Sequence, residues 1–154
     1  MGGIFLKFDD IDKILLNELI EDGRLSYVEL AEKTNISRVA VKDRIDSMKE
    51  NGIIEKFSVV INSEKIGKNV SAFFDIDVEP YQLEKVALNL ANNENVASIY
   101  QMTGPSTLHT HVLVEDFSNL ENFINKELYS VKGITRVDSH VILKRFKSRT
   151  GYKL

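Results

Sequence analysis

The sequence predicts an α+β protein with a helical N-terminal domain and a C-terminal domain in which strands and helices alternate. Apolar residues recur at helical spacing up to about residue 53, and beyond it they alternate along extended stretches that bracket two amphipathic helices. Turn signals such as Asp22-Gly23 and Asn51-Gly52 separate the segments. We therefore expect a domain of residues 1–53, a β connector and hinge of residues 54–68, and a domain of residues 69–154.

The composition is that of a globular protein and disfavours several other classes. No apolar run approaches the roughly 18–20 residues that span a bilayer, and the N-terminus lacks the pattern of a signal peptide. The chain has no cysteine, which excludes disulfides and thiolate metal sites and makes a reducing compartment the natural setting. We expect a cytoplasmic protein.

Three helices are expected in the N-terminal domain. The first begins at Asp9-Asp10, where a helix N-terminus favours negative charge, and its apolar stripe is formed by Ile11, Ile14, Leu15 and Leu19. The second begins at Ser26, which forms a capping box with Glu29. The third begins after a tight turn, with Ser37 as its N-cap, and buries Val41, Ile45 and Met48. Two helices joined by a short turn are the geometry of a helix-turn-helix.

The C-terminal domain is expected to contain four strands and two helices. The sequence places them, in chain order, as a strand at 70–78, a helix at 83–91, strands at 96–103 and 108–115, a helix at 120–128 and a strand at 134–146. The order βαββαβ is the ferredoxin-like pattern, an antiparallel sheet with helices on one face.

Local placement of charge, not bulk charge, decides whether DNA is a partner. The net charge is −3, so there is no overall electrostatic footprint for nucleic acid. On the third helix Arg38 and Lys42 flank the buried stripe and Val39 points outward. Asp46 makes the second half of this helix unfavourable to a phosphate backbone. We expect Ser37 through Lys42 to enter the major groove of double-stranded DNA.

The N-terminal half of the chain resembles the Lrp/AsnC (feast/famine) family of transcriptional regulators, and the residues after 54 resemble the ligand-sensing RAM domain of that family. The matching residues are Asp9 through Leu15, Asp22 through Ala31, Ile36-Ser37, Val41, Arg44-Ile45 and Gly52-Ile53-Ile54. The resemblance implies a winged helix-turn-helix, a homodimer that assembles further into tetramers or octamers, and regulation of transcription in response to amino acids. It places Ser37, Arg38, Val39 and Lys42 at groove-facing positions. It places Arg44 at a near-invariant arginine, with either a structural role or a phosphate contact.

The effector site of this family lies at a turn that contains a glycine, an aromatic residue and an aspartate. In this chain the corresponding residues are Thr103, Gly104, Ser106 and Thr107, so serine replaces the aromatic residue and threonine the aspartate. A threonine cannot supply the charge that pairs with an amino group. We therefore do not expect an amino acid to bind through the usual contacts. Four alternatives stay open: this turn binds a different small molecule, it binds an effector through backbone groups of residues 103–107, the protein has no effector, or the segment is only a structural turn.

Two further features of the C-terminal domain concern assembly and metals. Phe73 lies on the sheet face without helices and would be costly to expose, which favours burial against a second copy; residues 53–63 or the C-terminal tail could cover it instead. His109 and His111 share one strand face, but His140 lies on a strand that does not neighbour theirs, and no carboxylate partner is evident. We expect no metal and no cofactor, and the histidines could instead titrate near neutral pH and modulate assembly.

Two other functions compete with sequence-specific regulation. One is an architectural protein that coats DNA without sequence preference. The other is an enzyme, because a few chains of this architecture resemble tetrapyrrole decarboxylases. No nucleophile–base pair, phosphate loop or paired carboxylate is evident, so we do not expect catalysis.

Overall fold

The computed structural model describes residues 8–104 and 107–146, which form two compact units, residues 8–60 and 61–146. The division falls inside the connector expected at 54–68. Each unit has its own hydrophobic core. None of the described helices is long and apolar enough to cross a membrane.

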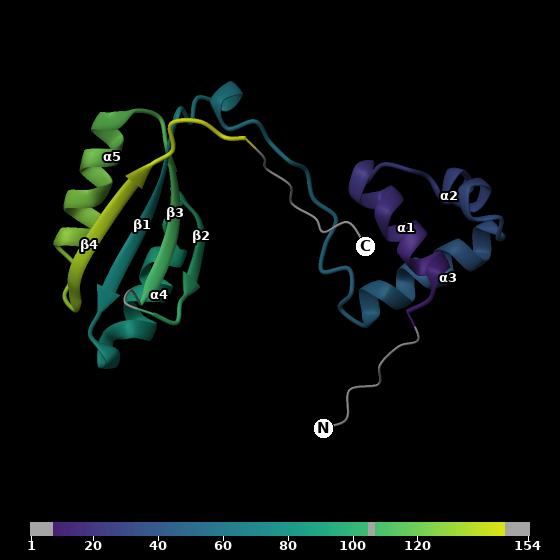
Figure 1. The fold of residues 1–154 in the computed structure, drawn as a ribbon, viewed down its shortest axis with the longest axis horizontal. Coiled ribbons are helices and arrows are strands. Elements are labelled where there is room, and N and C mark those ends of the chain that lie inside the picture. The colour runs from purple at the N-terminus through teal and green to yellow at the C-terminus, as the bar shows by residue number, and fades with distance from the viewer. Residues whose placement is uncertain (1–7, 105–106, 147–154) are drawn as a thin grey trace. The chain divides into compact units, whose positions relative to one another are not determined.

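The N-terminal unit contains the helices α1 (Asp10–Glu21), α2 (Tyr27–Thr34) and α3 (Arg38–Glu50) (Figure 1). The predicted capping box of α2 is confirmed, because the Glu29 carboxylate accepts from the Ser26 backbone N–H at 2.7 Å and the Ser26 hydroxyl accepts from the Glu29 N–H at 3.3 Å. Ser37 caps α3, as predicted, by accepting from the Ala40 N–H. These bonds satisfy N–H groups that a helix terminus otherwise leaves free.

The core of this unit confirms the stripe predicted for α3 and corrects the stripe predicted for α1. Its fully or almost fully buried side chains are Leu15, Leu30, Val41, Ile45 and Met48. Ile14, however, is 43% exposed. Asp12, two residues before Ile14, instead occupies an inward position on α1. Its carboxylate can be buried because it is paired with an arginine of α3. A buried charge needs such a partner, which apolar spacing does not reveal.

The turn between α2 and α3 depends on the backbone of one residue. Asn35 has φ 54°, the only positive φ of a non-glycine residue in the described part of the chain. Asparagine tolerates this left-handed conformation better than most residues and often follows a helix C-terminus. The chain therefore reverses within Asn35-Ile36-Ser37 and starts α3 directly.

The connector expected to be rich in β structure contains no strand in the described chain. Residues 55–62 have no regular secondary structure, and a short 3₁₀ turn follows at Glu64–Ile66. A strand requires a hydrogen-bonded neighbour, and this segment has none within one chain. Its apolar side chains Phe57, Val59 and Ile61 are all more than half exposed.

The C-terminal unit is a four-stranded antiparallel sheet with the order β2-β3-β1-β4. The strands are β1 (Val70–Val78), β2 (Val96–Gln101), β3 (Leu108–Val114) and β4 (Ile134–Val141). Between them lie a 3₁₀ turn at Pro80–Gln82 and the helices α4 (Leu83–Ala91) and α5 (Phe117–Phe123), the latter continued by a π-helical segment, Ile124–Tyr129. The predicted ferredoxin-like fold is confirmed.

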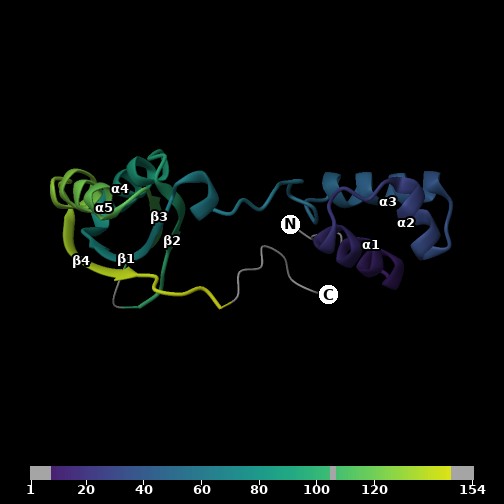
Figure 2. The same ribbon diagram turned by 90° about the horizontal axis from the view of Figure 1, so that it is seen from above.

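The two faces of this sheet differ. Along β1 the residues Ala72, Phe74 and Ile76 are fully buried, whereas those between them are only partly buried. The buried side chains pack against α4 and α5, and Figure 2 shows both helices on the same face of the sheet. No described helix covers the other face, which we call the open face.

The last strand is shorter than the predicted 134–146. Its final pair with β1 is Val141 with Ala72, and the Ile142 N–H still donates to the Ser71 carbonyl at 2.8 Å. Because β1 begins at Val70, later residues have no neighbour on that strand. β2 likewise ends at Gln101 instead of the predicted residue 103.

One core residue leads to a test of the packing. Thr110 is fully buried on β3, opposite Phe74, and its hydroxyl has no hydrogen-bond partner among the described residues. Because an unpaired buried hydroxyl is costly, Thr110→Val should raise the free energy of unfolding by about 1 kcal/mol in urea denaturation. Thr110→Ser, which keeps the hydroxyl and removes the methyl group, should lower it. A loss of stability in the valine variant would show that the hydroxyl does have a partner.

Candidate nucleic-acid interface and effector site

The surface of α3 next to the helix-turn-helix turn carries four of the residues predicted to contact DNA. Ser37, Arg38, Val39 and Lys42 are all exposed, and Val39 is exposed to 64%. The capping bond of Ser37 uses its hydroxyl oxygen as an acceptor at 3.1 Å, so the hydroxyl proton is free to donate. The N-terminal half of α3 thus presents a hydroxyl, a guanidinium, an aliphatic side chain and an ammonium group.

The two cations of this surface are not equivalent. Arg38 has no ion pair among the described residues, whereas the Lys42 ammonium lies 2.8 Å from the Asp46 carboxylate one turn later. This hydrogen bond raises the pKa of Lys42 above its ordinary value and lowers that of Asp46. In the free protein, therefore, Arg38 is available to an anion and Lys42 must first exchange its partner.

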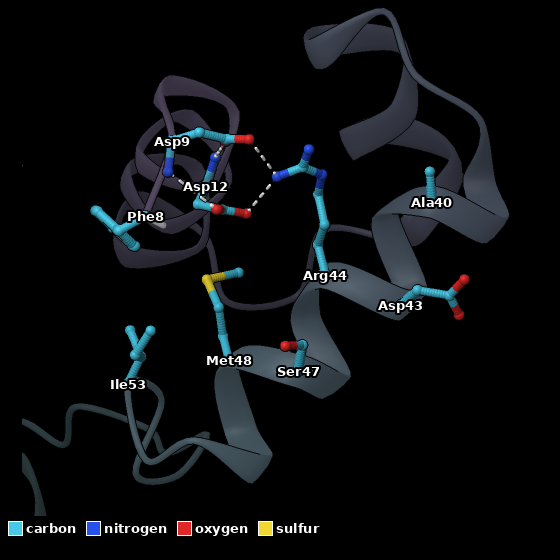
Figure 3. A pocket seen from close by; sticks show the side chains of 9 residues that line it. All are labelled: Phe8, Asp9, Asp12, Ala40, Asp43, Arg44, Ser47, Met48 and Ile53. Atoms are coloured by element: carbon cyan, nitrogen blue, oxygen red, sulfur yellow. Dashed lines mark hydrogen bonds and ion pairs between the residues drawn. The ribbon is translucent and has the colours of Figure 1, made fainter. Parts of the chain in front are cut away.

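Arg44, the fifth residue predicted to contact DNA, points from α3 toward the start of α1 (Figure 3). Its Nη1 lies 2.9 Å from Asp9 Oδ2 and 2.8 Å from Asp12 Oδ1. The two carboxylates also form the capping box of α1. They raise the pKa of Arg44, Asp12 more than Asp9. Of the two roles left open for Arg44, these contacts favour the structural one, and a phosphate contact stays a prediction.

The partners of Arg44 were not anticipated from the sequence. The acidic start of α1 suits the helix dipole, and Asp9 and Asp12 also have the spacing of a capping box. That spacing is a local signal for the cap. Their ion pairs with Arg44 join residues 35 and 32 positions apart, which no local pattern indicates.

The candidate effector turn follows β2, and part of it lies outside the described residues. Ser106 is one of these, so its predicted role is not placed. Gly104 has φ 131°, a conformation that favours glycine. Thr107 is held by the end of β1: its N–H donates to the Ile76 carbonyl, and its hydroxyl accepts from the Val78 N–H at 3.3 Å. The residue at the aspartate position therefore binds backbone, and Thr103 is exposed.

As expected, β4 with His140 does not neighbour β3 with His109 and His111, but the expectation that the histidines have no carboxylate partner is wrong. His109 Nδ1 donates to Asp75 Oδ1 at 2.8 Å, and His140 Nε2 lies 3.5 Å from Asp75 Oδ2. Because β1 lies between β3 and β4, its Asp75 reaches both imidazoles and is the carboxylate partner that the sequence did not reveal. Within residues 8–104 and 107–146, no three histidine or carboxylate side chains are grouped as a metal site requires.

Comparisons with known proteins cover both units. A family model described as the Lrp/AsnC ligand binding domain matches residues 71–152, and one described as winged helix-turn-helix DNA-binding matches residues 8–55. The HTH-type transcriptional regulator LrpA of Pyrococcus horikoshii is 32% identical over 139 residues, which cover 90% of this chain and 99% of that protein.

Solved structures show the same similarity. The leucine response regulatory protein LrpA of Mycobacterium tuberculosis has a TM-score of 0.81 and 31% identity, covering 95% of this chain and 99% of that one. A transcriptional regulator of Neisseria meningitidis in complex with L-Met has a TM-score of 0.88 at 24% identity, covering 92% and 94%, and shows the fold alone.

A helix-turn-helix unit followed by a ferredoxin-like ligand-binding unit defines a class of DNA-binding transcriptional regulators. The chain belongs to the Lrp/AsnC family within this class. The relative from Pyrococcus horikoshii is named as a regulator of transcription, not as an enzyme.

The contacts of Arg44 give a test that separates folding from DNA binding. Arg44→Ala should lower the free energy of unfolding of the N-terminal unit by about 1–2 kcal/mol, because it leaves the buried carboxylate of Asp12 without its partner. Arg38→Ala is the matched control: this exposed arginine has no ion pair among the described residues, so its variant should keep wild-type stability. Equal stability of both variants in urea denaturation would contradict a structural role for Arg44.

The same contacts predict how this unit responds to acid. The hydrogen bond from the Asp12 backbone, followed by that from Arg44, lowers the folded-state pKa of Asp9 below its ordinary value of 3.8. The contribution of Asp9 to stability is therefore fully present above that value and is lost as the pH falls through the lowered pKa. Chemical denaturation between pH 6 and 3 should show a smaller acid-induced loss in Asp9→Asn than in the wild type. An unchanged pH profile would contradict this.

Proposed function

We propose that this regulator binds operator DNA as a homodimer, and that each protomer inserts the N-terminal half of α3, residues 37–42, into the major groove. The observation that carries the proposal is the exposed set of Ser37, Arg38, Val39 and Lys42 at the start of a capped helix, directly after a helix-turn-helix turn. A recognition helix of this motif contacts base edges through its N-terminal residues. Chromosomal DNA as a partner implies the cytoplasm as the site of action.

Each side chain suits a different part of the duplex. The planar guanidinium of Arg38 can donate two hydrogen bonds to a guanine or to a phosphate. Val39 offers an aliphatic surface that fits a thymine methyl group. Ser37 and the free N–H groups of the first turn can contact a phosphate. Lys42 adds charge once it leaves Asp46.

The charge distribution favours specific over non-specific binding. The N-terminal 63 residues contain 9 Lys/Arg and 12 Asp/Glu, a net charge of −3. Non-specific affinity comes almost wholly from phosphate neutralisation and counterion release. A unit with this balance gains little from phosphates alone, so its affinity for an operator must come from base contacts. A protein that coats DNA without preference would need the opposite balance.

Homodimerisation is proposed through the open face of the sheet. Phe73 lies on this face, and the described residues of one chain place no helix over it. In a dimer with a two-fold axis, the same patch of each protomer is buried against that of the other. Such a dimer presents two recognition helices, about 34 Å apart, to a palindromic site. Tetramers or octamers would be built from such dimers.

Effector binding at residues 103–107 is proposed to differ from that of relatives that hold an amino acid. The Neisseria protein was solved with L-methionine. In this chain Thr107 supplies no charge, and its hydroxyl already accepts a hydrogen bond from Val78. We propose that any effector here is not an α-amino acid held by a carboxylate at this turn, and that it binds through backbone groups.

The DNA interface is tested by single substitutions. Arg38→Ala and Lys42→Ala should each weaken binding to a selected operator by about 1–3 kcal/mol if the side chain contacts a base edge. The operator would first be selected from a random DNA pool, and affinities would be measured by fluorescence anisotropy at several salt concentrations. Lys49→Ala, on the same helix but beyond residues 37–42, is the control and should change affinity little.

The outcomes distinguish the competing functions. Full affinity and sequence preference in both variants would remove residues 37–42 from the interface. If competitor DNA of any sequence displaces the operator from the wild type equally well, the protein is an architectural DNA-binding protein. Absence of binding at low salt would contradict the proposed function itself.

The effector proposal is tested by calorimetry. Titration of the full chain with each of the twenty amino acids should give no tight binding that depends on Thr107. The matched variant Thr107→Asp restores a carboxylate at this position and should gain affinity for an amino acid. Tight binding to the wild type that Thr107→Ala abolishes would overturn the proposal.

A further inference from the structure

The C-terminal unit has a small polar pocket at the end of β2 opposite the candidate effector turn. The pocket lies between the turn that leads from α4 to β2 and one face of α5 with its π-helical continuation, and its volume is about 160 Å³. Its polar lining consists of four asparagines, one lysine and one glutamate: Asn93, Asn95, Asn119, Asn122, Lys126 and Glu127. Residues 103–107 follow the other end of β2, so the two sites share no residue.

The turn between α4 and β2 is held by hydrogen bonds within the unit. The Asn93 N–H donates to the Leu90 carbonyl, and the Asn93 carbonyl accepts from the Val96 N–H. The Asn95 carbonyl accepts from the Leu113 N–H of β3 at 2.8 Å. Both asparagines are partly buried. This wall of the pocket is therefore pre-organised, which lowers the entropy lost when a ligand binds.

Both carboxamides of this turn have their oxygen atoms engaged by the protein. Asn93 Oδ1 accepts from the Asn95 N–H at 2.9 Å, and Asn95 Oδ1 accepts from the Lys68 ammonium at 2.9 Å. An asparagine whose oxygen is engaged still offers the two donors of its Nδ2 to another group. The turn side of the pocket thus presents chiefly donors, which suit an anionic oxygen and do not suit a hard metal cation.

The opposite wall carries one charge of each sign. Asn119, Asn122 and Lys126 are three and four residues apart, the spacing of one helix face, and the buried Phe123 completes the lining. Lys126 is exposed and Glu127 is partly buried. Neither side chain has a hydrogen bond or an ion pair among the residues that the structure describes. The lining is therefore neutral overall, but it contains both a cation and an anion that lack a partner in the described chain.

We propose that this pocket binds a small zwitterion whose ammonium group lies beside its carboxylate. The carboxylate accepts from the Nδ2 groups of Asn93 and Asn95 and pairs with Lys126, while the ammonium group pairs with Glu127. A simple anion or cation would leave one charge of the pocket unpaired, which is unfavourable where that charge is partly buried. This site is additional to the turn at 103–107, and its occupation does not depend on DNA.

The size of the pocket limits the ligand. A water molecule occupies about 30 Å³ of the liquid, so a volume of about 160 Å³ holds only a few of them. A ligand with about six non-hydrogen atoms, the size of alanine, fits this space. Such a ligand binds with a dissociation constant of about 1 mM, because the binding free energy that each atom can contribute is limited.

Three probes of nearly equal size test the charges of the pocket. L-Alanine, L-lactate and propionate carry an ammonium group, a hydroxyl and a hydrogen atom, respectively, beside the carboxylate. In NMR titrations of the nitrogen-labelled full chain, L-alanine should shift the carboxamide signals of Asn93 and Asn95. L-Lactate should bind about tenfold more weakly and propionate more weakly still, because neither carries the positive charge that pairs with Glu127.

Isosteric substitutions separate binding from folding. Asn95→Asp keeps the oxygen that accepts from Lys68 but replaces the donor with a second oxygen, so the Asn93 signal should report about tenfold weaker binding of L-alanine. Asn89→Asp, the same change at an exposed position of α4 outside the pocket, is the matched control and should leave the affinity unchanged. Glu127→Gln should bring the affinities for L-alanine and propionate together, which a purely structural role of Glu127 would not do.

The possible outcomes are distinct. The proposal is overturned if none of the probes shifts the Asn93 signal at concentrations well above the expected dissociation constant, or if all three bind equally well. Shifts that Thr107→Ala abolishes would place L-alanine at residues 103–107, which would overturn this proposal and the effector proposal together. If L-alanine shifts the Asn93 signal in a protein that binds no operator DNA, the pocket is supported and the proposed regulatory function fails.

Discussion

The ion pairs of Arg44 with Asp9 and Asp12 connect α3 to the first helix of the N-terminal unit. Three short helices bury little apolar surface, and five side chains form most of their fully buried core. The half-buried guanidinium of Arg44, which both carboxylates bind, fixes the orientation of α1 relative to α3. It can do so because hydrogen bonds between charged groups are strong and have defined geometry. The carboxylates also cap α1, so the cap, the helix orientation and the position of α3 depend on the same atoms.

The second unit is organised by a sheet with two unlike faces. The helix side of β1 is fully apolar and fully buried, which specifies the register because a slip by one residue would place Phe74 and Ile76 on the wrong face. The open face is polar, ordered by Asp75 and Phe73, and free of constraints from the core. Its side chains are not part of the buried apolar core.

The features that the sequence predicts correctly depend on neighbours in the chain. The caps at Ser26 and Ser37 and the buried stripe of α3 follow from spacing within a few residues. The errors depend on distant residues. Asp12 is buried against α3 because it pairs with Arg44, whereas Ile14 is exposed. β4 ends where β1 offers no further neighbour, and His140 approaches a carboxylate only through the strand order. The exposure of Ser37, Arg38, Val39 and Lys42 is predictable because helix periodicity fixes which side chains of α3 point outward.

If α3 contacts DNA as proposed, the hydrogen bond between Lys42 and Asp46 affects how the protein searches a chromosome for its operator. A lysine that already has an anionic partner gains little by exchanging it for an arbitrary phosphate, so it contributes weakly to transient encounters. At a matching site, neighbouring base contacts hold the helix in place long enough for the exchange to become favourable. The acidic Asp46 one turn away would thus shorten the residence time on unrelated sequences, both by occupying Lys42 and by repelling the duplex, and would speed the search for the operator.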